Sequence, residues 1–540
     1  MKLCKALERV IYYKLLFLVL FSCFAILLTV FYGTESYSVL HVFSHDESDQ
    51  VQRLQRLLEK DTLNTGGFIG GFYSYGQVYP TVAFWLAKLL GAFGFEQTSY
   101  QLLTLVLKVL STVFYYISGY VLFKTMLALN IKKILTYVFT FVFLIFPTYW
   151  TWSYTVHPDT LQMITIILPA YILLKVRNLK FSIVLASFVI GVSFGTKYSG
   201  IFLSIIIMSY VLISAINLKM VFREFFILSS WSFIAFIVGW LLFNPYVIVN
   251  FSKFFTELYL QGDYLKYGVG VPLNQNGLEW FRIYHYEFGS TLSLLLVAGI
   301  TSTILKYSYQ FLMCRSRGAC KSFFSNRENI FIVSIIIYLA ISLAYLIIIV
   351  KYREVRYSYH LLPYIILLSA YGFNLLISRY KIKKCYILVV SLFVIFHSYK
   401  LYDSNLRQLS VLYESKIENP LIKSGEWLKN NFSRDTSVLA GTYSYVESDY
   451  FKRYSMTYEL NAKTIDNFFP DVVVMNRDIP GRYVWKKPGT LLSDLDFNYG
   501  TWEDKELLND YELLYKKMTK KGSEWKVAYE DDAVVIFSKQ

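Results

Sequence analysis

Acidic side chains gather at residues 43–50, FSHDESDQ, directly after the first long apolar run of the chain. Asp46, Glu47 and Asp49 contribute carboxylates there, and His45 contributes an imidazole. A carboxylate can accept the proton of an attacking hydroxyl group, and these carboxylates lie where an apolar wall meets water. That position suits an amphipathic substrate with a lipid tail and a polar head. We therefore take Asp46 and Glu47 as candidate catalytic residues, with a solvated loop as the alternative interpretation.

Further ionisable groups open or close later apolar runs, in the segments HPDTLQ, GTKYSG and KYREVRYSYH. An ionisable group at membrane depth costs about 2.5–3.5 kcal/mol, so such groups tend to mark function. Lysine and arginine can hold a phosphate leaving group. A carboxylate base facing such cations would serve the displacement of a phosphate from the anomeric carbon of a sugar. The candidates are Asp159 as a second catalytic carboxylate, and Lys197, Arg353, Arg356, His360 and His157 as substrate or phosphate ligands.

Each of these residues also has a structural interpretation. Asp159 suits the N-terminal end of a helix dipole, and Lys197 could reach water from the end of a span. The two arginines could pair with Glu354 or with lipid headgroups. The histidines are typical of structural hydrogen bonding, although three on one face leave a divalent metal open, with His45 and Asp49 as its candidate ligands. The sequence indicates no other cofactor.

The composition is that of a membrane protein rather than a soluble one. Of 540 residues, 55% are hydrophobic and 17% are charged, whereas soluble domains are about 45–50% apolar and about 25% charged. The net charge of +15 comes from basic residues in short loops between apolar runs, as the positive-inside rule requires. No nucleic-acid motif accompanies this charge, so the expected partners include membrane lipid and no nucleic acid.

Apolar runs of about 20 residues predict a polytopic α-helical membrane protein with about eleven transmembrane helices. The first outer loop holds two further helices that we place in the membrane plane: an amphipathic helix over 49–60, capped by Ser48, and an apolar helix over 79–93. Placing the second helix in the plane keeps the basic loops on one side, with the N terminus in the cytoplasm. The predicted spans are 12–31, 99–123, 133–150, 159–176, 181–197, 199–217, 225–247, 288–307, 329–350, 359–378 and 385–402.

The chain changes composition after the last predicted span, which indicates two domains. These are a transmembrane module over 1–402 and a soluble α/β domain over 403–540 on the outer face. The elements predicted in the second domain are helices at 420–431 and 504–520 and strands at 437–445 and 471–475. The segment WKVAYEDDAVVIFSK ends the chain and is typical of a hairpin that turns at Asp531 and Asp532.

Five segments together resemble the membrane-embedded glycosyltransferases of the GT-C class, in particular the branch with the protein O-mannosyltransferases and the lipid A aminoarabinose transferase. The segments are HDESDQ, SYGQVYPTVAFWLAKLLGAFGF, HPDTLQ, GTKYSGIFL and VRYSYHLLPYIILLSAYG. Each segment is short, so the resemblance rests on the order of the segments and on the side of the membrane where they lie. The resemblance covers the whole membrane body, and the tail is similar to the outer α/β domains of that class.

The resemblance implies a GT-C fold, a polyprenyl-phosphate sugar donor and transfer with inversion. Asp46 matches the first-loop acidic position that serves as catalytic base, and Asp159 matches the second acidic position. Lys197 matches a recurrent lysine, Arg356 matches the arginine of the late motif, and Tyr75 in SYGQVYP is a candidate substrate contact. The chain departs from the pattern before the apolar in-plane helix. It has QVYP where Lys-Pro-Pro is usual, so the phosphate-contacting lysine expected there is missing.

These observations predict a membrane glycosyltransferase of the bacterial inner membrane with its active site on the outer, periplasmic face. It would move a sugar from a polyprenyl-phosphate carrier to the hydroxyl of a glycan, lipid-linked or protein acceptor. One alternative is a flippase or transporter for a lipid-linked glycan, but its charges should spread through the spans and it usually has internal repeats. Another is a polysaccharide ligase or polymerase with a diphosphate donor, which would depend on arginines and a histidine more than on Asp46.

Overall fold

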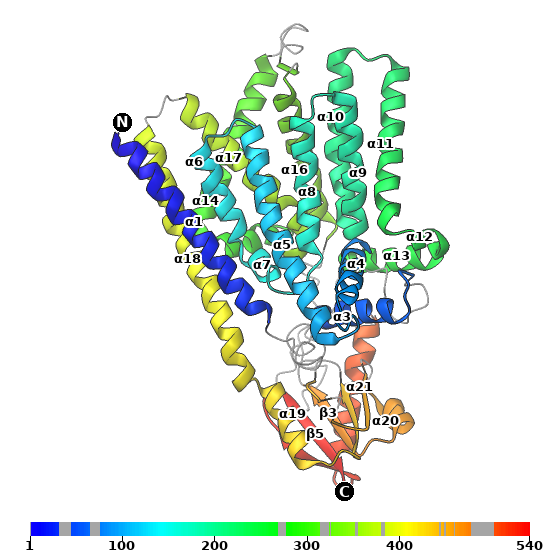
Figure 1. Cartoon of the computed structure of the whole chain (residues 1–540). Helices are drawn as coiled ribbons and strands as arrows, with labels where there is room; N and C mark the ends of the chain where they lie inside the picture. Colours follow the sequence, from blue (N-terminus) through cyan, green and yellow to red (C-terminus); the bar gives the residue numbers. More distant parts are fainter. Residues whose placement is uncertain are drawn as a thin grey trace.

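The computed structural model shows a helical membrane body joined to a small α/β domain (Figure 1). The structure describes residues 2–31, 45–64, 76–267, 277–313, 323–324, 326–350, 355–379, 384–441, 444–447, 450–457, 460–476 and 502–540. Among these residues, eight helices are long and apolar enough to cross a membrane. The chain is therefore an integral membrane protein.

Every predicted span overlaps a helix, although the number of eleven crossings stays a prediction. The helices concerned are α1 (Lys2–Val30), α5 (Tyr100–Ala128), α6 (Lys133–Leu144), α8 (Asp159–Lys175), α9 (Leu179–Thr196), α10 (Ser204–Leu218), α11 (Phe222–Phe243), α14 (Glu279–Met313), α16 (Arg327–Ile348), α17 (Leu362–Arg379) and α18 (Lys384–Glu418). Two 3-10 turns precede spans, η1 (Tyr198–Leu203) before α10 and η2 (Val355–Leu361) before α17.

The single helix predicted over 133–150 is wrong, because the chain forms two helices there. α6 ends at Leu144 and α7 (Pro147–Trp152) follows it. Phe146 has the extended conformation, φ −59° and ψ 120°, that a residue before proline prefers. With 12 residues, α6 is about 18 Å long, well short of the roughly 30 Å of a bilayer core.

The amphipathic helix of the first loop begins earlier than predicted. α3 (His45–Glu59) starts at His45, so Ser48 is not its cap but a fully buried residue of its first turn. The carboxylates of the 43–50 segment therefore lie at a helix N-terminus, where the helix dipole favours negative charge. The apolar stripe of α3, with Val51 and Leu54 at 0% exposure, packs against α4 (Val78–Ala92) and α5 rather than facing lipid.

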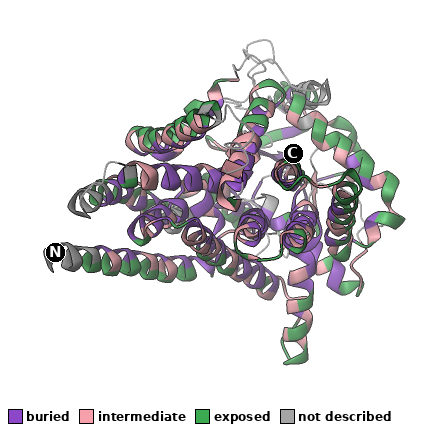
Figure 2. Ribbon diagram, turned by 90° about the horizontal axis from the view of Figure 1, so that it is seen from above, coloured by how far each residue is buried: buried purple, intermediate pink, exposed green. Residues whose placement is uncertain are grey.

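The two ends of the helix bundle differ in what they carry (Figure 1). The N terminus lies at one end, which we call the N-terminal end. At the opposite end lie α3, α4, α12 (Tyr246–Val249), α13 (Phe251–Tyr267) and the C-terminal sheet, and we call it the Asp159 end. Seen from above, buried residues lie mainly in the inner helices and exposed ones around the rim (Figure 2). The described helices of the first outer loop, α3 and α4, thus lie at the Asp159 end.

Glycines allow two pairs of helices to approach closely inside the bundle. A Cβ atom on Gly191 of α9 would lie 2.0 Å from the carbonyl oxygen of Phe236 in α11. The same holds between α14 and α17, where a Cβ on Gly372 would lie 1.8 Å from the oxygen of Gly299. In a membrane, where lipid tails are as apolar as leucine, such backbone contact is a main source of helix association.

The C-terminal domain is a five-stranded mixed sheet with helices on both faces. Its strand order is β2-β1-β3-β5-β4, with β1 parallel to β2 and β3, and with β5 antiparallel to β3 and β4. Its elements are α19 (Pro420–Asn431), β1 (Ser437–Gly441), β2 (Arg453–Thr457), α20 (Ala462–Phe468), β3 (Val472–Asn476), α21 (Trp502–Thr519), β4 (Trp525–Glu530) and β5 (Val534–Lys539). The predicted helices, the strands β1 and β3 and the terminal hairpin are confirmed, whereas β2 and α20 were missed.

One helix joins the membrane body to this domain. α18 runs over 35 residues from Lys384 to Glu418, so the predicted boundary at 402–403 falls inside a continuous helix. No glycine or proline interrupts the chain between Lys384 and Asn419, and the change from apolar to polar residues occurs without a break. Pro420 then opens α19, with the Asn419 side chain accepting from the Leu421 amide.

We expect Gly372→Leu to destabilise the membrane body by at least about 2 kcal/mol, because the side chain would be forced into the backbone of α14. Gly262→Leu on α13 is the matched control, since a Cβ there would meet nothing within 4 Å. Thermal unfolding in detergent measures the effect. An unfolding midpoint for Gly372→Leu equal to that of the control would contradict the close contact of α14 with α17.

Candidate functional site

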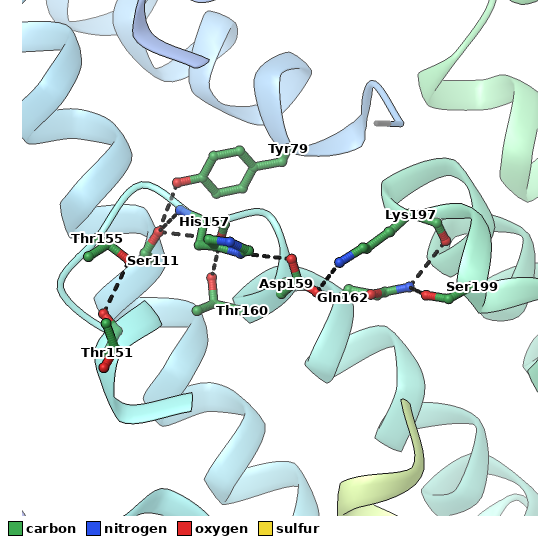
Figure 3. A network of polar contacts seen from close by, with 10 residues as sticks. All are labelled: Tyr79, Ser111, Thr151, Thr155, His157, Asp159, Thr160, Gln162, Lys197 and Ser199. Atoms are coloured by element: carbon green, nitrogen blue, oxygen red, sulfur yellow. Dashed lines mark hydrogen bonds and ion pairs between the residues drawn. The ribbon is translucent and has the colours of Figure 1, made fainter. Parts of the chain in front are cut away.

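The centre of the site is a buried carboxylate at the first residue of α8 (Figure 3). The Asp159 side chain is 2% exposed, and both of its oxygens are engaged. The Lys197 Nζ atom lies 2.8 Å from Oδ1, and the Nδ1 atom of His157 lies 2.7 Å from Oδ2. Burying a charge in an apolar body is costly unless it is paired, so these two partners are what make the position tolerable.

Local structure brings Asp159 and Lys197 to the same place. Pro158 caps α8, so Asp159 lies in the first turn, where the helix dipole stabilises a carboxylate. Lys197 ends α9 in an extended conformation, φ −156° and ψ 136°. Its carbonyl oxygen accepts from the Gln162 Nε2 atom at 3.1 Å, and Gln162 also donates to Ser199 Oγ at 3.0 Å. Gln162 therefore fixes the turn that carries the lysine.

Neighbouring residues hold both the ring and the backbone amide of His157. Its ring stacks on Trp152, with centroids 4.2 Å apart and planes 6° apart. Its backbone amide donates to Ser111 Oγ at 3.2 Å, and the Ser111 hydroxyl lies 2.9 Å from the hydroxyl of Tyr79 on α4. These contacts hold the imidazole against Asp159 and link the site to the apolar helix of the first loop (Figure 3).

The acidic segment of the first loop reaches the same cluster through Glu47. The Glu47 side chain is 3% exposed, and its Oε2 atom accepts from the amide of Val156 at 2.6 Å. Val156 directly precedes His157, so α3 is pinned beside the segment that leads to Asp159. His45 and Asp46 lie in the first turn of the same helix, but their side chains are outside the described part of the chain.

The late motif supplies a second cation beside Lys197. The Nζ atom of Lys197 lies 6.0 Å from the ring centroid of Tyr357, and the guanidinium carbon of Arg356 lies 5.3 Å from the same centroid. His360 is 2% exposed and its ring stacks on Phe202, with centroids 5.3 Å apart. Arg356 is thus at the site, and His360 forms part of the wall behind it.

The segment before α4 also meets the lysine turn. The Gly76 amide donates to the Thr196 carbonyl at 3.2 Å, and the Gln77 amide donates to Asn244 Oδ1 at 2.8 Å. A Cβ on Gly76 would lie 1.8 Å from the oxygen of Gly195, so only glycine permits this approach. Tyr75, the next residue back, lies outside the described residues, as does Arg353.

The structure therefore brings together most of the proposed residues whose side chains it describes. Five of them form one cluster at the Asp159 end, namely Glu47, His157, Asp159, Lys197 and Arg356. Asp49 is exposed on α3. Within the described ranges, no group of three His, Cys, Asp or Glu side chains could hold a metal ion.

Some residues of the site were missed by sequence reasoning. Gln162 lies three residues after Asp159 in HPDTLQ, so helical spacing was a signal for it. Ser111 and Tyr79 carried no comparable signal. Neither did Glu287 on α14, whose carboxylate accepts from the Thr148 hydroxyl at 3.0 Å and from the Thr148 amide at 3.4 Å. Those bonds cap the first turn of α7, which ends at the Trp152 ring that supports His157.

Chemically, the cluster pairs a carboxylate with cations at the edge of an apolar body. Lys197 and Arg356 place two positive charges within 6.0 Å of the Tyr357 ring centroid, which suits an anionic group such as a phosphate. Asp159 has both oxygens engaged and Glu47 is bonded to a backbone amide. These two carboxylates are therefore placed to orient other groups.

No protein-family model matches the sequence, and no curated protein matches it either. Among solved structures, the chain is similar to ArnT from Cupriavidus metallidurans bound to undecaprenyl phosphate, with 9% identity, a TM-score of 0.49 and 97% of each chain covered. For ArnT from the same organism in the apo state the identity is 12% and the TM-score 0.47, over 91% of this chain and 92% of that one.

The oligosaccharyltransferase of Archaeoglobus fulgidus, in complex with Zn and sulfate, is also similar, with 12% identity and a TM-score of 0.45. That match covers 91% of this chain and 69% of the other. ArnT and this oligosaccharyltransferase are both GT-C glycosyltransferases, the class that the sequence motifs resemble. Identities of 9% to 12% assign neither an activity nor a substrate to the present chain.

Proposed function

We propose that this protein is a membrane glycosyltransferase that moves a sugar from a polyprenyl-phosphate carrier to an acceptor hydroxyl. The observation that carries the proposal is the buried Asp159 between Lys197 and His157, at the end of the bundle where the acidic first loop and the late basic motif meet. A phosphate on a lipid tail needs both a cationic cradle and an apolar wall. This end of the bundle offers both.

In the proposed step, the acceptor hydroxyl loses its proton to a carboxylate base and its oxygen forms a bond to the anomeric carbon. The bond from that carbon to the phosphate oxygen breaks, and its electron pair leaves with the polyprenyl phosphate. Attack from the face opposite the phosphate inverts the anomeric carbon. Charge develops on the departing phosphate, so fixed cations beside it would stabilise the transition state.

We assign the base to Asp46, because Glu47 and Asp159 are engaged by an amide, an ammonium and an imidazole. Asp46 precedes Glu47 at the N-terminus of α3, which the Glu47 bond pins beside the cluster. Lys197 and Arg356 hold the phosphate. Glu47 and Asp159 act as positioning residues for α3 and for Lys197.

The remaining assignments follow from the sequence. Tyr75 and Arg353 are further substrate contacts, and His157 and His360 line the phosphate side of the site. A divalent metal at His45 and Asp49 stays a proposal that a chelation experiment can test. The site faces the periplasm of a bacterial inner membrane, with the N terminus in the cytoplasm and a glycan, lipid-linked or protein acceptor.

Replacing Asp46 by Asn should reduce sugar transfer by about 100-fold or more, because a general base contributes roughly 10²–10⁴ to the rate. The measurement is transfer from a panel of polyprenyl-phosphate sugars by full-length protein in liposomes, with binding of the donor followed separately. Glu59→Gln, at the exposed far end of α3, is the matched control and should retain activity.

Equal transfer by Asp46→Asn and wild type would remove the base assignment. If transfer then appeared only with diphosphate-linked donors and depended on Arg356, the ligase mechanism would replace the proposed one. Transport of a lipid-linked glycan without sugar transfer would favour the flippase.

Asp159→Asn should raise the KM for the donor by about tenfold or more, because Lys197 loses the carboxylate that orients it. Lys197→Met should act in the same direction, and the double variant should be little worse than either single one, since both remove one interaction. Lys197→Arg should recover part of the donor affinity. Asp263→Asn on α13, an acidic residue at the same end, is the control.

Steady-state kinetics on the same donor panel, together with the thermal unfolding midpoint of each variant, measure the coupling. Additive losses in the double variant would show that Asp159 and Lys197 act separately. A fall in the unfolding midpoint with unchanged KM and kcat would mean that the pair serves stability alone.

A further inference from the structure

A second feature lies on the flank of the bundle, away from the Asp159 cluster. α1, α5 and α6 enclose an apolar groove with a cavity volume of about 320 Å³. Its lining includes Leu16 and Val19 of α1, Gly119 of α5 and Phe141 of α6. A Cβ on Gly119 would lie 2.8 Å from Leu144 Cδ2, so this glycine keeps α5 and α6 close and leaves the hollow beside them.

One end of the groove is rimmed by tyrosines. Tyr12 of α1, Tyr120 of α5 and Tyr137 of α6 line the groove. All three lie in the part of their helix that is nearer the N-terminal end of the bundle. The rings of Tyr12 and Tyr137 lie edge to face, with centroids 5.0 Å apart. Tyrosines prefer the level of the lipid headgroups, where the ring is in an apolar layer and the hydroxyl meets water. The rim therefore marks where headgroups meet the groove.

Lysine side chains lie over two of these tyrosines, Tyr120 and Tyr137. The Lys124 Nζ atom lies 5.2 Å from the Tyr120 ring centroid, and the Lys133 Nζ atom lies 5.7 Å from the Tyr137 ring centroid. Arg9 is exposed and lies three residues before Tyr12, on the same face of α1. Of the described residues that line the groove, none is acidic. The groove thus joins an apolar channel to a positively charged mouth.

We propose that this groove binds an anionic phospholipid of the leaflet at the N-terminal end, with its phosphate between Lys124 and Lys133. One acyl chain lies against Leu16, Val19 and Phe141. From Tyr12 to Val19 the lining of α1 extends about 10 Å along the helix, which accommodates the first part of an acyl chain. An apolar groove alone would accept any lipid, and the lysines select the anionic headgroup.

The proposed lipid is distinct from the sugar donor. Lys124 is close to the C-terminal end of α5 and Lys133 is the first residue of α6, and these helix ends lie at the N-terminal end of the bundle. Asp159 begins α8 and Lys197 follows α9, and these helix ends lie at the opposite end of the bundle (Figure 1). A phosphate held at the tyrosine rim is therefore at the opposite end of the bundle from the candidate site. The inference does not depend on the proposed function and would hold for a transporter as well.

The test is lipid retention by the full-length protein in detergent, measured by native mass spectrometry with phosphatidylglycerol and phosphatidylcholine of identical acyl chains. The wild type should retain phosphatidylglycerol about tenfold more tightly. The double variant Lys124→Gln, Lys133→Gln should lose that preference. The matched control is Lys219→Gln with Arg223→Gln, two exposed cations at the end of α10 and the start of α11, at the same end of the bundle.

A second variant tests the apolar part of the groove. Leu16→Trp places a large ring in the apolar part of the groove and should weaken retention of phosphatidylglycerol without changing any charge. Thermal unfolding confirms that each variant folds. Equal retention of both lipids by the wild type, or an unchanged preference in the double lysine variant, would overturn the headgroup site. Unchanged retention by Leu16→Trp would overturn the placement of the acyl chain.

Discussion

The buried charge of Asp159 constrains the rest of its end of the bundle. A carboxylate at 2% exposure in an apolar body needs compensating partners, and Lys197 and His157 provide them at 2.8 and 2.7 Å. This requirement sets where α8 begins and where α9 ends. It also explains why polar side chains such as Gln162 and Ser111 are buried nearby, because they hold the backbone that carries the two partners.

Close backbone contact also holds the first loop beside the turn that carries Lys197. Gly76 donates to Thr196, and a side chain on Gly76 would collide with Gly195. The first loop can therefore reach the lysine turn only because two glycines leave room. Glu47 secures the other end of that loop through the Val156 amide. The acidic helix and the lysine turn are thus tied to one segment, residues 156–159, from two sides.

The sequence predicts the elements of this protein better than their contacts. Apolar runs locate the membrane helices, and HPDTLQ and GTKYSG place Asp159 and Lys197 at span ends, because both signals are local. The break at Pro147 was missed since the apolar run continues through it. The partner of Glu47 is a backbone amide 109 residues away, and no residue type marks such a donor. Glu287 was missed for the same reason, because it caps α7 across the fold.

Basic residues at the two ends of the bundle have different physical roles. The positive-inside rule accounts for the number of lysines and arginines in the short loops, but not for their positions within those loops. Lys197 is buried, and its ammonium lies against a carboxylate. Lys124 and Lys133 instead lie over tyrosine rings at the mouth of an apolar groove, where Lys124 is half-buried and Lys133 is exposed. A paired, buried cation can be held in one place for chemistry, whereas a cation at an aromatic rim can exchange water for an anionic headgroup. The environment of each cation, rather than its residue type, therefore separates a candidate reaction site from a candidate lipid site.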